Sequence, residues 1–223
     1  MARPVKIQGV ITIILLVLLA MMVAAGVGVT LMYVQTGPGD EDIPYETPHV
    51  DPLAVSREGP AVAGVKILAA PVLYCLDGGS SMRDAFDGAR VMTANSVESL
   101  GDGMKFTVVL CGETEDRFLS ADYSGGGPKG KAATLAFLKE TVPSGATDLP
   151  RALKAALARG PKTIVLLARK VVDDAAEVAA EARKQGVVIH TIAVDPDAEV
   201  AASMKKLAET TGGEGRAFYG GAF

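Results

Sequence analysis

The stretch PVLYCLDGGSSM, residues 71–82, decides how this chain is interpreted. A short apolar run ends at Asp77, and a loop of glycine and serine follows directly. A continuous apolar run of this length is typical of a strand that is buried on both faces of a sheet. The loop after it has four possible uses: it holds a metal ion, cradles a phosphate, exposes a nucleophilic serine, or only turns the chain.

The alternation of strand-like and helix-like segments continues to the C-terminus. Besides 71–77, strands are predicted at 104–112, 116–120 (a hairpin partner), 162–168, 187–194 and 216–219 (an edge strand). Helices are predicted at 84–100, over a segment marked by Leu135, Leu138 and Val142, at 149–157, 173–185 and 197–211, with a loop at 125–130. This order predicts an α/β fold whose mostly parallel sheet is flanked by helices on both faces.

The N-terminal part of the chain has a different composition. No charged residue lies between Ile7 and Gly39, so one transmembrane helix is predicted over 7–34. Arg3 and Lys6 precede this helix and an acidic stretch follows it, so residues 1–6 are predicted to be cytoplasmic and the rest extracytoplasmic. The alternative is a signal peptide cleaved near 23–25, although signal peptides usually have a shorter apolar region. Residues 35–60 are predicted to be a linker, and 61–223 a folded domain.

Composition excludes several classes of partner and site. The 223 residues carry a formal net charge of −4 without a basic cluster, and tryptophan is absent, so nucleic acid is not an expected partner. Two cysteines and two scattered histidines do not make a zinc site. Cys75 and Cys111 are expected to be buried thiols, and a disulfide between them is the alternative in an oxidising compartment.

The loop at 76–82 lacks the features of two of the four uses. It has neither the lysine nor the third glycine of a phosphate-binding loop, and it lacks the final glycine of a nucleophile elbow. His49 lies in the predicted linker and His190 in a predicted strand, so no general base is evident. Catalysis is therefore not expected, and a Rossmann-like enzyme remains only an alternative function.

A metal site fits this loop better. An aspartate followed by serine hydroxyls puts hard oxygen ligands on one turn, which suits Mg²⁺ or Mn²⁺. The segment GATDLPRAL, residues 145–153, adds Thr147 and Asp148, and Asp148 is placed to cap the helix that follows. Because ligands bind at the carboxyl ends of parallel strands, both loops are expected at the same edge of the sheet.

From about Val65 to the C-terminus, the chain resembles the von Willebrand factor A domain family. LDGGSSM resembles the family's D-x-S-G-S-M loop, and GATDLPRAL its G-G-T-D-x-x-x-A-L segment. HTIAVDPDAEVAASMKKLAETTGG, residues 190–213, is similar to the family's closing strand and helix, while IVLLARK (164–170) stands where a strand usually ends in T-D-G. The resemblance implies a Rossmann-like domain that binds proteins.

In this family the three loops form a metal-ion-dependent adhesion site. The resemblance carries ligand roles over to Asp77, Ser81 and Thr147. Gly79 replaces the first loop serine, which removes one hydroxyl ligand, and Arg169 replaces the last aspartate. Two unit charges about 4 Å apart interact by about 4 kcal/mol at an effective dielectric constant near 20. Because a divalent ion carries two charges, the guanidinium of Arg169 would repel it about twice as strongly.

The site is therefore predicted to be degenerate and to hold no ion. The guanidinium of Arg169 is expected to form a salt bridge with Asp77, and the alternative is that it turns into solvent. Asp173 or Asp174 remains a possible replacement carboxylate. Binding of Mg²⁺ or Mn²⁺ is accordingly kept as the alternative to a site without a cofactor.

The predicted function is protein binding by a membrane-anchored domain. The partner is expected in or near the membrane, and the contact surface at the strand ends of the domain. The residues predicted to form this binding rim are Gly79, Ser80, Arg83, Asp148 and Arg169. A purely structural envelope component is a further alternative.

Overall fold

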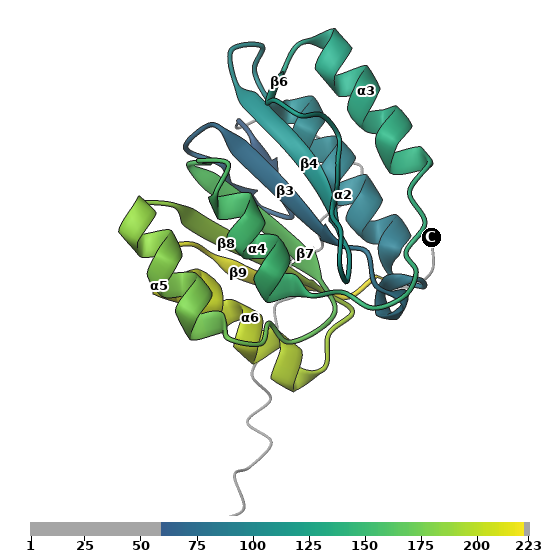
Figure 1. The fold of residues 1–223 in the computed structure, drawn as a ribbon. Coiled ribbons are helices and arrows are strands. Elements are labelled where there is room, and N and C mark those ends of the chain that lie inside the picture. The colour runs from purple at the N-terminus through teal and green to yellow at the C-terminus, as the bar shows by residue number, and fades with distance from the viewer. Residues whose placement is uncertain (1–58, 221–223) are drawn as a thin grey trace, which may run out of the picture. The chain divides into compact units, whose positions relative to one another are not determined.

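The computed structural model of the chain describes residues 59–220, and the predicted transmembrane helix at 7–34 lies outside them. A seven-stranded sheet forms the centre of this region (Figure 1). Its order is β5-β4-β3-β7-β8-β9, and β6 also pairs with β4. The parallel strands are β3 (Val72–Asp77), β4 (Lys105–Cys111), β7 (Thr163–Ala168), β8 (Val188–Val194) and β9 (Gly215–Phe218). The antiparallel ones are β5 (Arg117–Phe118) and β6 (Ser124–Gly125).

Helices cover both faces of the sheet, as the sequence predicts. One face packs against α2 (Phe86–Ser99) and α3 (Pro128–Lys139), and the other against α4 (Leu149–Leu157), α5 (Ala175–Gln185) and α6 (Ala198–Thr210). Every residue of β3 and β7 is buried, because both strands lie inside the sheet with a core on each side. None of the helices in residues 59–220 is long and apolar enough to cross a bilayer.

Capping residues set the ends of three helices, and Asp148 is the cap that the sequence predicts. The Asp148 carboxylate accepts a hydrogen bond from the backbone N–H of Arg151 at 2.9 Å, and Asp197 accepts one from Val200 at 2.8 Å. Gly186 ends α5 with a φ of +67°, in the left-handed region where glycine is favoured. The predicted bounds of α4, α5 and α6 accordingly lie within two residues of the observed ones.

Two regions differ from the prediction. A small hairpin of β1 (Ala61–Val62) and β2 (Val65–Lys66) packs on the α2 face and was not predicted. Helix α3 begins at Pro128, inside the predicted loop 125–130, because proline suits the first turn of a helix. Of the residues that mark the predicted helix, Leu135 and Val142 are 53% and 71% exposed, and Val142 lies beyond the helix, which ends at Lys139.

The order of the strands changes direction at β3, which places an edge suited to ligand binding there. It passes from β3 to β4 on one side and later returns to β7 on the other side of β3. The loops that follow β3 and β7 therefore meet at the carboxyl ends of neighbouring strands, where α/β folds bind ligands. Residues 78–83, 144–148 and 169–174 form this edge, and we call them together the rim. Within the rim, Ser80–Met82 forms a short 3₁₀ turn.

Candidate functional site

Asp77 is the buried carboxylate at the centre of the rim. Its Oδ1 accepts hydrogen bonds from the backbone N–H of Gly79 at 2.9 Å and from the hydroxyl of Thr147. Its Oδ2 is buried and has no hydrogen-bond partner among the described residues. The structure thus brings Asp77 and Thr147 together, two of the residues to which the sequence assigns ligand roles, and leaves one carboxylate oxygen unsatisfied.

Gly79 lies against the same pair of side chains. A Cβ atom at this position would collide with Thr147 Oγ1 and lie 3.1 Å from Asp77 Oδ1 and 3.7 Å from Ser81 Oγ. The space that a serine side chain needs at position 79 is therefore occupied by the hydroxyl of Thr147. Glycine in place of the first loop serine therefore leaves room for the hydroxyl of Thr147 to bond directly to Asp77.

The two loops of the rim are joined through their backbones. The N–H of Ser80 donates to the Gly145 carbonyl at 2.9 Å, and the N–H of Ser144 donates to the Gly78 carbonyl at 2.7 Å. Gly145 has a φ of +69°, a conformation that side-chain-bearing residues rarely adopt. The loops after β3 and before α4 consequently form one rigid surface.

Arg169 does not pair with Asp77. Its Nε–H donates to the backbone carbonyl of Asp195 at 3.1 Å, and Nη1 donates to that of Ser81 at 3.5 Å. The predicted salt bridge is wrong, because these carbonyls hold the guanidinium while the carboxylate faces Thr147. Arg169 also does not turn freely into solvent, since it is half-buried against the first rim loop.

Lys170 brings a second cation to the rim that the sequence interpretation missed. Its ammonium group donates to the backbone carbonyl of Thr147 at 2.8 Å. Arg169 and Lys170 therefore reach, from the end of β7, the main chain of two residues with predicted ligand roles, Ser81 and Thr147. The available signal was the second basic residue in IVLLARK, directly beyond a buried strand.

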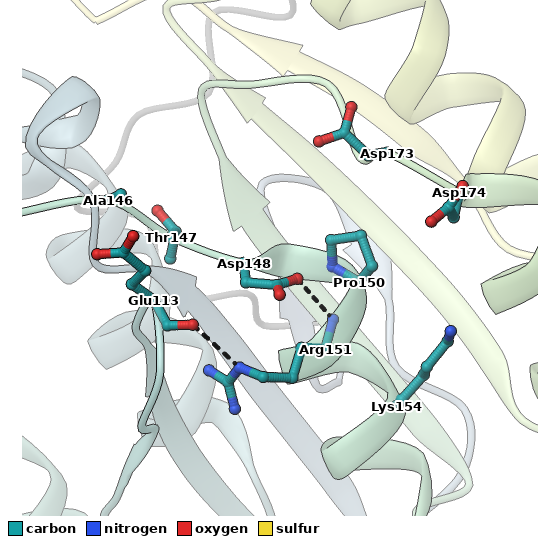
Figure 2. Close-up of a pocket in the computed structure, with 9 residues that line it drawn as sticks. All are labelled: Glu113, Ala146, Thr147, Asp148, Pro150, Arg151, Lys154, Asp173 and Asp174. Atoms are coloured by element: carbon teal, nitrogen blue, oxygen red, sulfur yellow. Dashed lines mark hydrogen bonds between the residues drawn. The ribbon is translucent and has the colours of Figure 1, made fainter.

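Thr147 also lines a cavity of about 620 Å³ (Figure 2). Its carboxylates belong to Glu113, Asp148, Asp173 and Asp174, and its remaining lining is Ala146, Thr147, Pro150, Arg151 and Lys154. Asp77 does not line it. The structure therefore places Asp173 and Asp174, the predicted replacement carboxylates, on the cavity and not around Asp77.

Arg151 holds one wall of this cavity in place. Its guanidinium makes two hydrogen bonds to the buried Asp116 carboxylate, at 2.8 and 2.9 Å, and others to the carbonyls of Gly112 and Glu113. The hydrogen bonds to Asp116 raise the pKa of Arg151 above its usual value. Four of the five N–H groups of this guanidinium thus join α4 to the loop after β4.

Comparisons with known proteins support the fold. No curated protein matches the chain. The family model of the von Willebrand factor type A domain matches residues 72–216, which is more than half of the chain. The chain belongs to the von Willebrand factor type A family.

Two solved structures with the von Willebrand factor type A fold or a similar one illustrate the likeness. The first is a von Willebrand factor type A protein from Catenulispora acidiphila, at 19% identity and a TM-score of 0.55, covering 66% of this chain and 38% of that one. The second is the human COPII-coat protein Sec24c, at 10% identity and a TM-score of 0.50, covering 70% of this chain and 30% of that one. At these identities the likeness shows the fold, and the chain spans less than half of either protein.

The metal ion that the von Willebrand factor type A family implies can be tested against these contacts. The unsatisfied Oδ2 of Asp77 is an atom that a cation would satisfy. Against this, Gly79 offers no side-chain oxygen, and Arg169 and Lys170 bring two positive charges to the same place. Among residues 59–220, no three acidic, histidine or cysteine side chains gather closely enough to hold a metal. A single carboxylate, with two cations held on the backbone carbonyls of neighbouring Ser81 and Thr147, does not fit a divalent ion.

The remaining candidate residues of this von Willebrand factor type A domain are structural. Cys75 and Cys111 are buried free thiols, and the pKa of Cys111 is raised by its hydrogen bond to Cys75 and by burial. His190 is buried in β8, and its Nδ1 accepts a hydrogen bond from the backbone N–H of Glu214 at 3.0 Å. His190, which the sequence places in a strand, is therefore a hydrogen-bonded core residue.

Proposed function

We propose that this protein is a membrane-anchored von Willebrand factor A domain protein that binds a protein partner through its rim, without a divalent ion and without catalysis. The domain lies on the extracytoplasmic side, and the partner lies in or near the membrane. Family membership supports protein binding as the general role. The rigid backbone of the joined rim loops supports the rim as the contact surface.

The observation that carries the metal-independent form is the charge balance around Asp77. Two basic side chains from the end of β7 donate to the carbonyls of Ser81 and Thr147, next to the residues that would hold the ion. A divalent cation there meets repulsion from both, and its attraction to a single carboxylate does not offset that repulsion. Partner binding is therefore expected to survive removal of divalent ions.

A specific observation also favours a second candidate, metal-dependent ligand binding. Asp77 Oδ2 is buried without a hydrogen-bond partner among the described residues, and such atoms are rarely left unsatisfied. If a cation occupies this position, Arg169 and Lys170 have to swing outward. Partner binding then requires Mg²⁺ or Mn²⁺ and is lost in chelator.

Site-directed photo-crosslinking in native membranes tests the proposal. A photoreactive residue at Ser80, which is exposed on the rim, is expected to capture one specific protein, equally well with Mg²⁺ and with EDTA. Charge reversal of the exposed Arg83 should weaken capture with little change in melting temperature. A photoreactive residue at the exposed Lys206, on α6, is the matched control. Capture that depends on Mg²⁺ favours the second candidate, and no saturable capture refutes both.

The membrane anchor is tested separately. Reporter fusions after Gln35 should report an extracytoplasmic position, because Arg3 and Lys6 flank the apolar stretch on one side and acidic residues flank it on the other. A cytoplasmic readout would contradict the proposed topology. The result does not depend on whether the rim binds a metal.

A further inference from the structure

The segment that joins β2 to β3 exposes a large apolar side chain. Burial alternates along residues 65–68, with Val65 and Ile67 buried and Lys66 and Leu68 exposed. Because the side chains of an extended segment alternate between its two sides, Lys66 and Leu68 project to the same side, away from the core. Leu68 is 87% exposed. A single exposed leucine is common on protein surfaces, so its surroundings decide whether it has a use.

Two lysines lie at the starts of the strands on either side of β3. Lys105 begins β4, and Lys162 directly precedes β7. Both strands pair with β3 from its first residue, so these lysines flank its start. The N–H of Lys162 donates to the carbonyl of Pro71 at 2.8 Å, three residues after Leu68. Both lysine side chains are exposed and make no hydrogen bond or ion pair within residues 59–220. We call the surface of Leu68, Lys105 and Lys162 the strand-start face.

Positive charge exceeds negative charge around the strand-start face. Four carboxylates at this end of the sheet form salt bridges: Glu98 with Lys131, Glu181 with Lys184, Glu209 with Lys205 and Glu214 with Arg216. Asp102 and Asp122 form none within the described part of the chain. The basic residues outside these salt bridges are more numerous, and they include Lys105, Lys129, Arg159, Lys162 and Arg183. Such a face attracts an anionic surface that lies within reach.

The N-terminal part of the chain joins the domain at the strand-start face. The carbonyl of Pro60, at the start of the described residues, accepts the N–H of Ile67 at 2.8 Å, directly before Leu68. The apolar stretch proposed as the membrane anchor, residues 7–34, is connected to this face by the predicted linker 35–60. A tether raises the effective concentration of the face at the bilayer, so a contact too weak to hold a free protein is sufficient here.

We infer that the strand-start face rests on an anionic phospholipid bilayer, with Lys105 and Lys162 on the headgroups and Leu68 inserted beside them. This inference rests on the proposed function, because it requires the membrane anchor. Lysines near an anionic membrane are attracted to its surface potential, and an adjacent apolar side chain enters the boundary between headgroups and acyl chains. The occupant is therefore a lipid surface, which offers negative charge and an apolar layer together.

The contact orients the rim away from the bilayer. Strand β3 runs from the strand-start face to the rim, and its six residues span about 20 Å. The rim carries equal numbers of acidic and basic residues: Asp148, Asp173 and Asp174 against Arg83, Arg169 and Lys170. An anionic bilayer therefore attracts the strand-start face more than the rim. The rim is left open to a partner.

Fluorescence quenching in vesicles tests this orientation. The full-length chain carries a fluorescent amino acid at Leu68 or at Ser80, which is exposed in the rim. It is reconstituted in vesicles of phosphatidylcholine alone, or of phosphatidylcholine and phosphatidylglycerol in equal amounts. Both contain a trace of lipid with a nitroxide quencher on its headgroup.

The label at Leu68 should be quenched in the phosphatidylglycerol vesicles, and less than half as much in phosphatidylcholine alone. The label at Ser80 should be quenched little in either lipid. Raising the salt concentration from about 0.1 M to about 1 M shortens the screening length from about 10 Å to about 3 Å. Most of the difference between the two lipids should then disappear at Leu68.

The variant Lys105→Gln/Lys162→Gln removes two charges from the strand-start face. Its melting temperature should not change, and quenching at Leu68 in phosphatidylglycerol vesicles should fall to the level in phosphatidylcholine. The matched control Arg83→Gln/Lys139→Gln removes two exposed charges, from the rim and from the end of α3, and should leave quenching unchanged. The lipid and salt comparisons use the native lysines, so they stay decisive if the lysine variant fails to fold.

The inference is overturned if the label at Leu68 is quenched no more than the label at Ser80, or equally in both lipids. It is also overturned if the lysine variant is quenched as strongly as its matched control. A photoreactive residue at Leu68 that joins two copies of the chain would assign the face to self-association and overturn it too.

Flotation of the vesicles separates failure of this inference from failure of the proposed anchor. A chain that floats with neither lipid lacks the anchor, which refutes both. If the chain floats and the label at Leu68 is not quenched, the anchor stands and only the lipid contact of the strand-start face is refuted. Capture of a partner at Ser80 is independent of either result.

Discussion

Arg151 and Arg169 come from different elements, and their guanidinium groups have different partners. Arg151 on α4 forms a bidentate pair with Asp116, whose side chain is 4% exposed. Arg169 at the end of β7 contacts only the carbonyls of Asp195 and Ser81. The guanidinium of Arg151 is therefore paired with a buried carboxylate, whereas that of Arg169, in the rim, contacts only backbone carbonyls.

The largest expected effect is on the free energy of unfolding, which should fall more for a variant of Arg151 than for a variant of Arg169. Arg151→Met leaves the Asp116 carboxylate buried without its cation, and we expect a loss of about 3 kcal/mol in the free energy of unfolding. Arg169→Gln removes hydrogen bonds to carbonyls only and should cost less than about 1 kcal/mol. Urea unfolding of the chain from Gln35 onward measures both. Equal losses would show that Arg169 matters as much to stability as Arg151 does.

The second prediction concerns Gly79 and Thr147, which lie against each other in the rim. Gly79→Ala should displace the Thr147 hydroxyl from Asp77 and cost about 2 kcal/mol, because a buried carboxylate loses a donor. Thr147→Ala removes both the donor and the obstacle. The double variant should therefore be no less stable than Thr147→Ala alone. Additive losses in urea unfolding would show that Gly79 and Thr147 do not share this space.

The comparison also shows what the sequence could and could not reveal. The buried strands, the Asp148 cap and the Gly186 helix end follow from local patterns of burial and capping, and the structure has them. The turn between β1 and β2 was missed because Ala63 has a φ of +45° there, in place of the asparagine or aspartate that usually signals such a turn.

Pairings at the rim were harder to predict than elements. Placing Arg169 near Asp77 was a sound inference from loop order, but sequence order does not tell whether a guanidinium meets a carboxylate or a carbonyl. That choice depends on how the loops after β7 and β8 approach each other, and it positions Arg169 on Asp195 and Ser81. Lys170 was missed for the same reason, since its contact with Thr147 spans 23 residues of sequence.

The smallest predicted effect concerns His190, a buried residue of β8 with a structural role. Burial lowers the pKa of His190, and its neutral Nδ1 accepts the Glu214 N–H. Because the folded-state pKa lies below the unfolded one, His190 contributes full stability above its usual pKa of about 6.5. That contribution is lost as pH falls through the folded-state pKa. His190→Asn keeps an acceptor without titrating, so its melting temperature should fall less between neutral and mildly acid pH. Parallel pH profiles for the two proteins would contradict this role.

The most direct test of a rim that works without a divalent ion is thermal melting with Mg²⁺ and with EDTA. An ion that binds only the folded state raises the melting temperature as its concentration exceeds its dissociation constant. We predict superimposable curves for the native chain up to millimolar Mg²⁺. The variant Gly79→Ser/Arg169→Asp/Lys170→Gln should gain a Mg²⁺-dependent rise, because it adds a hydroxyl and a carboxylate and removes both cations. A saturable Mg²⁺-dependent rise in the native chain would contradict the account, since an ion would then occupy the place assigned to Arg169 and Lys170.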